Sequence, residues 1–358
     1  MFKKYYRKGS EEMAHFSDAI YQLVSLLMSL LMSIGAITTP ATDDVIKIIE
    51  EDTIINLIIV GDPQVCNYNP EREASLIAAS EDMMNSETPF DAFISVGDIA
   101  ENGFQDEYDR VYDDTHEINA DNFIMCAGNH DIRLREYEQS SERFINFMNR
   151  YNDEENAVDS IRYTYEVNGY TFIVMASDKS KFEDAFISDE QLQWLNLELK
   201  ENARNGKPVF VICHFPLAEA HGLPGTWGSA DSGSSTGRLP LYTPKADYDY
   251  TGSIGESSNA VHEILSKYKN VFFITGHLHT AFGVNTYQAI NEENNVQGIN
   301  VPSVSIKSKD GTYNAAGTGL YAEVTPDEVI FYARDFENGR YLTTDDFSET
   351  VAVFPLVK

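Results

Sequence analysis

Five apolar runs along this chain each stop abruptly at a group of polar residues, and this pattern restricts the fold more than any other. The runs are residues 54–60, 91–96, 122–127, 208–213 and 271–275. They are rich in β-branched and aromatic residues, as strands buried on both faces are. Helical patterns lie between them, at 71–84, 105–119, 137–150, 188–204 and 258–269. Strands that alternate with helices predict a layered α/β domain.

Two further stretches have the pattern of β-hairpins. Residues 161–176 turn at Asn168-Gly169, and residues 319–334 turn near Thr325-Pro326-Asp327. Asn-Gly is a strong signal for a tight turn between antiparallel strands. We therefore expect an α/β sandwich whose sheets are mixed, with both parallel and antiparallel strands.

The polar groups at the strand ends consist of residue types that bind metals. They are Gly61-Asp62-Pro63-Gln64, Gly97-Asp98-Ile99-Ala100-Glu101-Asn102-Gly103, Gly128-Asn129-His130-Asp131, Cys213-His214-Phe215-Pro216 and Gly276-His277-Leu278-His279. In an α/β sheet, ligand sites form where the carboxyl ends of strands meet. Oxygen donors combined with imidazoles suit Mn, Fe or Zn, and seven or more such groups are too many for one ion. The pattern predicts a dinuclear site of the kind that serves phosphoryl transfer.

In this order the motifs resemble those of the calcineurin-like metallophosphoesterase superfamily, over roughly residues 54–335. The resemblance implies a four-layer α/β/β/α sandwich with two mixed β-sheets and a metal site at the carboxyl ends of the strands. It also implies two divalent ions (Mn, Fe or Zn) and a bridging hydroxide that hydrolyses a phosphomonoester or a phosphodiester. The alternative is a catalytically weakened protein of the same fold that binds a phosphate or nucleotide ligand.

The resemblance also implies a metal ligand at seven positions. The first metal would be held by Asp62, Gln64 and His279, the second by Asn129, His214 and His277, and both by Asp98. The usual first motif of the family is Asp-x-His, so Gln64 is the sharpest departure from the pattern. Its neutral amide oxygen is a weaker ligand than an imidazole, which implies a first metal that binds less tightly or differs in identity.

Two further motif residues would serve catalysis. His130 would protonate the leaving oxygen or stabilise charge on the phosphoryl group. Glu101 lies where some members of the superfamily carry an Asp that orients this histidine, and the other interpretation is a solvated loop residue. Arg133 and Arg135 would bind phosphate or cap a helix.

The charge and the N-terminus bear on partners and location. The chain has 26 basic and 57 acidic residues, a formal charge of −31, which disfavours binding to nucleic-acid duplexes. A basic start precedes the uncharged apolar run 20–37, which is typical of a signal peptide or a membrane anchor. We expect a secreted or membrane-anchored extracellular protein, and the alternative is an amphipathic helix on a cytoplasmic one.

The expected organisation has three parts and one insertion. Residues 1–37 form the signal peptide or anchor, 38–52 a linker and 53–358 the metallophosphoesterase domain. Residues 221–257 are rich in Gly, Ser, Pro and Tyr, and we expect this insertion to lie over the metal site. Its residue His221 is a candidate for contact with a phosphoester substrate or for packing. The sequence leaves the substrate and the oligomeric state open.

Overall fold

The computed structural model describes residues 45–223, 251–306 and 317–358. The chain divides into two units, Met1–Pro40 and Ala41–Lys358, and the fold below is that of the second unit. The predicted signal or anchor segment and residues 224–250 of the predicted insertion lie outside the described residues. In the part that is described, no helix has the length and apolarity needed to cross a membrane.

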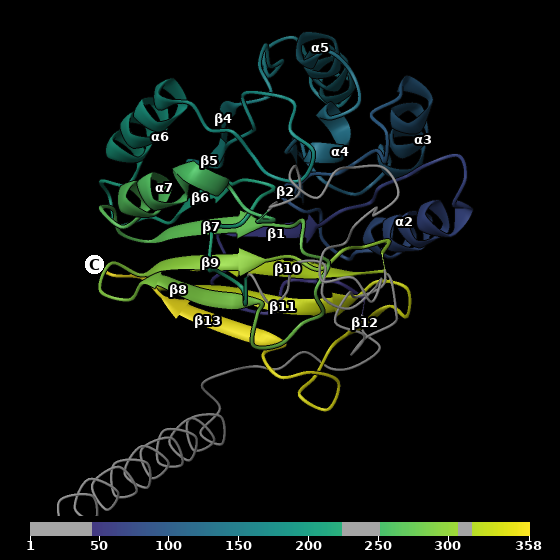
Figure 1. Cartoon of the computed structure of the whole chain (residues 1–358). Helices are drawn as coiled ribbons and strands as arrows, with labels where there is room; N and C mark the ends of the chain where they lie inside the picture. Colours follow the sequence, from purple (N-terminus) through teal and green to yellow (C-terminus); the bar gives the residue numbers. More distant parts are fainter. Residues whose placement is uncertain (1–44, 224–250, 307–316) are drawn as a thin grey trace, which may run out of the picture. The chain divides into compact units, whose positions relative to one another are not determined.

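The first β-sheet contains the first three predicted strands and the second predicted hairpin (Figure 1). Its order is β12-β11-β10-β1-β2-β3, with β13 paired to β11. Strands β1, β2 and β3 are parallel, and the other pairings are antiparallel. The strands are β1 Ile55–Val60, β2 Ala92–Ser95, β3 Phe123–Met125, β10 Thr318–Val324, β11 Glu328–Asp335, β12 Arg340–Tyr341 and β13 Val351–Pro355.

The second sheet has the order β4-β5-β6-β7-β9-β8. Strands β5, β6, β7 and β9 are parallel, while β4 and β8 pair antiparallel at the two edges. The strands are β4 Tyr163–Val167, β5 Tyr170–Val174, β6 Val209–Ile212, β7 Val271–Thr275, β8 Tyr287–Asn291 and β9 Val296–Asn300. Asn168 and Gly169 both have positive φ, as the predicted hairpin turn requires. Both sheets are therefore mixed, as expected.

Three hydrophobic cores separate four layers. Alternate residues of β1 face opposite ways: Ile58 and Val60 pack under the helices of the first sheet, while Leu57 and Ile59 pack against the second sheet. The first sheet is covered by α2 Pro70–Met84, α3 Gln105–Thr115 and α5 Tyr137–Met148, and the second by α6 Asp189–Asn202 and α7 Ser258–Leu265. This order confirms the α/β/β/α sandwich. The remaining helices are short: α4 Asn129–Ile132 and the 3₁₀ helix η2 Gly255–Ser257.

The described part of the predicted linker, residues 45–52, belongs to the domain. Ile46 is buried in the core beneath the helices of the first sheet. The buried carboxylate of Glu323 in β10 accepts hydrogen bonds from the main-chain nitrogens of Ile49 (2.7 Å) and Glu50 (2.9 Å). Because a buried carboxylate needs such donors, this segment and β10 fix each other in place.

Candidate metal centre

Residues that follow four different strands meet at one place. Potential ligand atoms of Asp98, His214 and His277 lie within 4.8 Å of one another, and so do those of Asp62, Asp98 and His279. All five residues are buried. Asp98 belongs to both groups, which is the position at which the family resemblance implies the bridging carboxylate.

The main chain is strained where it delivers these side chains. Five of the predicted ligands have positive φ, a conformation that few residues other than glycine adopt. They are Asp62 (φ 51°), Gln64 (43°), Asp98 (51°), His277 (72°) and His279 (52°). Such strain costs on the order of 1–3 kcal/mol for each residue and persists where the surrounding structure or a ligand requires it. Its concentration here marks a functional site.

Glycines before the ligands allow the strand ends to approach closely. A Cβ atom on Gly276 would lie 2.6 Å from Asp62 Oδ2, and one on Gly128 would overlap Asp98 Oδ1. In each case a side chain from one strand end occupies the space beside the backbone of another. The Gly that opens these motifs therefore has a packing role as well as a turn role.

The histidine tautomers are fixed by backbone carbonyls, which can only accept a hydrogen bond. His214 Nδ1 lies 3.0 Å from the carbonyl oxygen of Val96, and His277 Nε2 lies 3.0 Å from that of Glu183. Both of these nitrogens therefore carry a proton. The remaining nitrogens, His214 Nε2 and His277 Nδ1, face each other at 3.1 Å, and Asp98 Oδ2 lies 3.2 Å from His214 Nε2. Three lone pairs converge, an arrangement that only a cation or an added proton between them makes stable.

The electrostatics of these side chains agree with this geometry. Burial alone would lower the pKa of His214, but the carboxylates of Asp98 and Asp62 raise it to about 9. Burial alone would raise the pKa of Asp98, but His214 and His130 hold it well below its usual range. Without metal, the cluster therefore binds a proton through the same negative potential that attracts a divalent ion. The residues present fit a metal centre.

The two amide residues lie at the cluster in different ways. Asn129 donates from Nδ2 to the carbonyl oxygen of Phe182 at 2.9 Å, while its buried Oδ1 accepts no hydrogen bond from the described residues. That oxygen is suited to a metal. Gln64 is buried, and its Nε2 donates to Asp98 Oδ2 at 3.0 Å, so the amide nitrogen faces the cluster. Since a rotation of the amide exchanges its nitrogen and oxygen, ligation by Gln64 stays a prediction.

His130 lies beside the cluster. Its Nε2 is 3.8 Å from Asp98 Oδ2, and its Nδ1 is 2.8 Å from the carbonyl oxygen of Glu101. Nδ1 therefore lies between this acceptor and a donor, Arg133 Nη2 at 2.9 Å, while Nε2 faces the cluster. The Glu101 carboxylate also approaches Nδ1, at 3.4 Å. Burial lowers the pKa of His130 to about 4, which keeps the imidazole neutral.

Asp131 is a residue of the third motif for which the sequence suggested no role. Its buried carboxylate accepts hydrogen bonds from the main-chain nitrogens of Ile99 (3.2 Å), Ala100 (3.0 Å) and Gly128 (2.9 Å). It therefore ties the loop after β2 to the loop after β3. An acidic residue at the third position of a short helix is a weak signal for such a contact.

The two arginines after this motif have different surroundings. Arg133 contacts His130 and Glu183, with its Nη2 2.9 Å from His130 Nδ1. Arg135 instead stacks its guanidinium on the ring of Phe104, 4.9 Å from the ring centroid. Only Arg133, of these two, touches a residue predicted to take part in catalysis.

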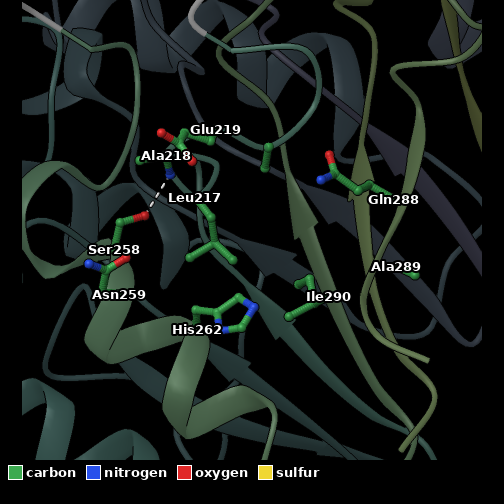
Figure 2. A pocket seen from close by; sticks show the side chains of 10 residues that line it. Leu217, Ala218, Glu219, Ser258, Asn259, His262, Gln288, Ala289 and Ile290 are labelled. Atoms are coloured by element: carbon green, nitrogen blue, oxygen red, sulfur yellow. Dashed lines mark hydrogen bonds between the residues drawn. The ribbon is translucent and has the colours of Figure 1, made fainter. Parts of the chain in front are cut away.

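A separate pocket of about 340 Å³ lies between the loop after β6, helix α7 and the edge strand β8 (Figure 2). Its lining includes Leu217, Ser258, His262 and Gln288, and none of the predicted ligands. His221 lies close in sequence to the loop after β6 that lines this pocket. Its ring is buried, and its Nδ1 is 2.8 Å from the carbonyl oxygen of Asn285. His221 is therefore a packing residue, the second of the two roles that the sequence allowed.

Comparison with known proteins identifies the family and agrees with the fold. A sequence model of the calcineurin-like phosphoesterase family matches residues 55–281, more than half of the chain. A dimetal phosphatase from Danio rerio has a similar structure, with a TM-score of 0.52, 15% identity and coverage of 80% of this chain and 97% of that one. A purple acid phosphatase from yellow lupin (Lupinus luteus) seeds has a TM-score of 0.52 at 12% identity, with 84% of this chain and 53% of that one covered.

At these identities the structural similarities show the shared fold, and no curated protein matches the sequence significantly. The family match covers β1, β2, β3, β6 and β7 and the motifs that follow them. This chain belongs to the calcineurin-like phosphoesterase family.

Proposed function

We propose that this protein is a metal-dependent phosphohydrolase that cleaves a phosphomonoester or a phosphodiester at a centre of two divalent ions. The observation that supports this most is the convergence of lone pairs from His214, His277 and Asp98, with both imidazole tautomers fixed by carbonyls. Such a buried group offers a site for one cation, and the second group that shares Asp98 offers a site for another.

The residues would divide between the ions as the family pattern implies. Asp62, Gln64 and His279 would hold one ion, Asn129, His214 and His277 the other, and Asp98 both. When bound, the ions would supply Lewis acidity, which lowers the pKa of the attacking water and neutralises the phosphoryl oxygens.

The protein itself supplies the proton at the leaving oxygen. With one proton at Nδ1 facing the Glu101 carbonyl, His130 would take up a second proton from solvent at Nε2, beside the cluster. Because burial disfavours the imidazolium, His130 would pass this proton to the leaving alkoxide and return to the neutral form. Glu101 serves as the residue that orients His130, through both its carbonyl and its carboxylate.

The test is hydrolysis of p-nitrophenyl phosphate and bis(p-nitrophenyl) phosphate by the full chain, after chelation and with Mn²⁺, Zn²⁺ or Fe²⁺ added back singly. Turnover that requires metal and is lost in Asp98→Ala would support the proposal, and the preferred ester would identify the substrate class. If no metal restores turnover while the loaded protein binds inorganic phosphate tightly, the protein is instead a phosphate-ligand binding protein of this fold.

A further inference from the structure

The segment between β5 and α6 carries no recognisable motif, yet it contacts two of the predicted ligands of the second ion. The carbonyl oxygen of Phe182 accepts from Asn129 Nδ2 at 2.9 Å. The carbonyl oxygen of the next residue, Glu183, lies 3.0 Å from His277 Nε2. We refer to these two residues as the 182–183 turn.

These contacts decide which atoms the ligands present. Because Asn129 uses its amide nitrogen for Phe182, its Oδ1 is left for a metal. Because His277 donates its Nε2 proton to Glu183, its Nδ1 lone pair faces His214. Partners that fix ligand orientation in this way typically change metal affinity by about 10–100-fold.

One arginine holds the turn against the helix that carries Asn129 and His130. Arg133 Nη1 lies 3.1 Å from Glu183 Oε1, and its guanidinium lies 4.5 Å from the centroid of the Phe182 ring. The side chains of Arg133 and Glu183 are only 11% and 21% exposed, so water screens this ion pair less than a surface pair. Arg133 also reaches His130, with its Nη2 2.9 Å from Nδ1.

The other side of the turn is fixed as well. The Asp184 carboxylate accepts hydrogen bonds from the main-chain nitrogens of Thr251 (2.8 Å) and Gly252 (2.9 Å). The turn therefore lies between these residues and Arg133.

We infer that Arg133 and Glu183 are positioning residues for the second metal site: their ion pair fixes the 182–183 turn, whose carbonyls orient Asn129 and His277. This inference rests on the proposed function, because it requires the two-metal centre. It also assigns Arg133 a role other than gripping substrate phosphate, since Glu183, Phe182 and His130 already surround its guanidinium.

The experiment is calorimetric titration of the metal-free full chain with Mn²⁺, for the parent, Arg133→Ala, Glu183→Ala and the double variant. We expect one of two Mn²⁺ sites to weaken about 10–100-fold in each single variant while the other keeps its affinity. The two side chains act as a unit, so their effects on Mn²⁺ affinity should not add. The double variant should therefore have the same Mn²⁺ affinity as the single variant that is affected more. Glu183→Gln, which keeps a hydrogen-bond acceptor for Arg133, should recover part of the loss.

Matched controls come from neighbouring ion pairs and arginines. Arg135→Ala removes the arginine two positions along, and Glu190→Ala removes a carboxylate that is 81% exposed on α6 and pairs with Arg162. Both should bind two Mn²⁺ with the affinities of the parent. Thermal unfolding of each metal-free variant shows whether the domain itself is intact.

Three results would overturn the inference. If Arg133→Ala keeps both Mn²⁺ affinities and only weakens the inhibition of ester hydrolysis by inorganic phosphate, Arg133 binds phosphate instead. If both Mn²⁺ sites weaken equally and the thermal midpoint falls, the pair is a general structural contact. If the parent binds fewer than two Mn²⁺, the two-metal centre is wrong and the inference fails with it. Two tight Mn²⁺ sites without ester hydrolysis would contradict the proposed function alone.

Discussion

Replacing His130 with alanine tests whether this residue is a proton donor or a metal ligand. Its Nε2 lies 3.8 Å from Asp98 Oδ2, beside the cluster, and it belongs to neither group of potential ligand atoms. Truncation therefore removes the proposed proton donor and leaves the seven predicted ligands in place. The main-chain nitrogen of residue 130, which donates to Asp98 Oδ1 at 2.9 Å, is also retained.

The expected size of the effect depends on the leaving group. General acid catalysis contributes about 10²–10⁴-fold, which corresponds to roughly 2.7–5.4 kcal/mol of transition-state stabilisation. An alkyl phosphate releases a strongly basic alkoxide, so His130→Ala should lose this full factor. p-Nitrophenolate leaves without a proton, so the same variant should lose less than about 10-fold on that ester.

The assay compares kcat for an alkyl and a p-nitrophenyl ester at saturating Mn²⁺, together with Mn²⁺ binding by calorimetry. His116→Ala, which removes an exposed imidazole stacked on Tyr112, serves as the control and should match the parent. Equal losses on both esters would show that His130 stabilises charge rather than supplying a proton. Loss of a bound Mn²⁺ would show that His130 is a ligand, and the role assigned to it would be wrong.

Four further changes test the site and the fold. Gly128→Ala should abolish Mn²⁺ binding in calorimetry, because the new Cβ overlaps Asp98 Oδ1; retained binding would mean that the two strand ends are not in contact. Gln64→His should tighten one of the two Mn²⁺ sites, and an unchanged affinity would place Gln64 outside the ligand set. Removing metal with a chelator should lower the thermal midpoint, since an ion at 100 times its Kd stabilises the folded state by about 2.7 kcal/mol; a constant midpoint would contradict a site inside the folded domain. Hydrogen bonds from Arg340 lower the pKa of Asp346 from 3.8 to about 2, so they stabilise the fold above pH 3.8 and this contribution is lost as the pH falls towards 2. Asp346→Asn should therefore lower the urea midpoint at neutral pH and match the parent at the acidic end, and a difference independent of pH would refute the assignment.

The elements that the sequence predicted are those with a local signal. The apolar run that ends at Gly61-Asp62 predicts both a buried strand and the place where it stops, because a parallel strand is apolar on both faces and its polar end lies at the sheet edge. The helix predicted over 188–204 has a local start signal, because Ser188 Oγ accepts from the Gln191 nitrogen at 3.2 Å. Strands β8, β9, β12 and β13 were missed, and of these β12 and β13 are stabilised by pairing with β11 rather than by their own sequence.

The convergence of the candidate ligands could be predicted for the same reason, whereas the residues that contact and orient them could not. Each ligand follows a strand, so order along the chain and sheet topology suffice to bring them together. The 182–183 turn contributes main-chain carbonyls, which any residue carries, so no side-chain pattern identifies it. Arg133 was noticed only for its charge, because its partner Glu183 is 50 residues away and only the folded structure shows the pair.

These observations explain why the opening motif ends in Asp62-Pro63-Gln64. Positive φ at Asp62 and Gln64 directs both side chains back towards Asp98 and His279, which a continued strand would not do. A left-handed residue on each side of a proline is unfavourable by itself, and main-chain hydrogen bonds from Asp62 to Gly97 (3.2 Å) and from Gln64 to Asp98 (2.8 Å) hold it in place. The same conformation recurs at Asp98, His277 and His279, from two other strand ends. Strain repeated at separate points of one cluster is expected of a site that must present its side chains in one arrangement, and the converging lone pairs fit the proposal that this site binds cations.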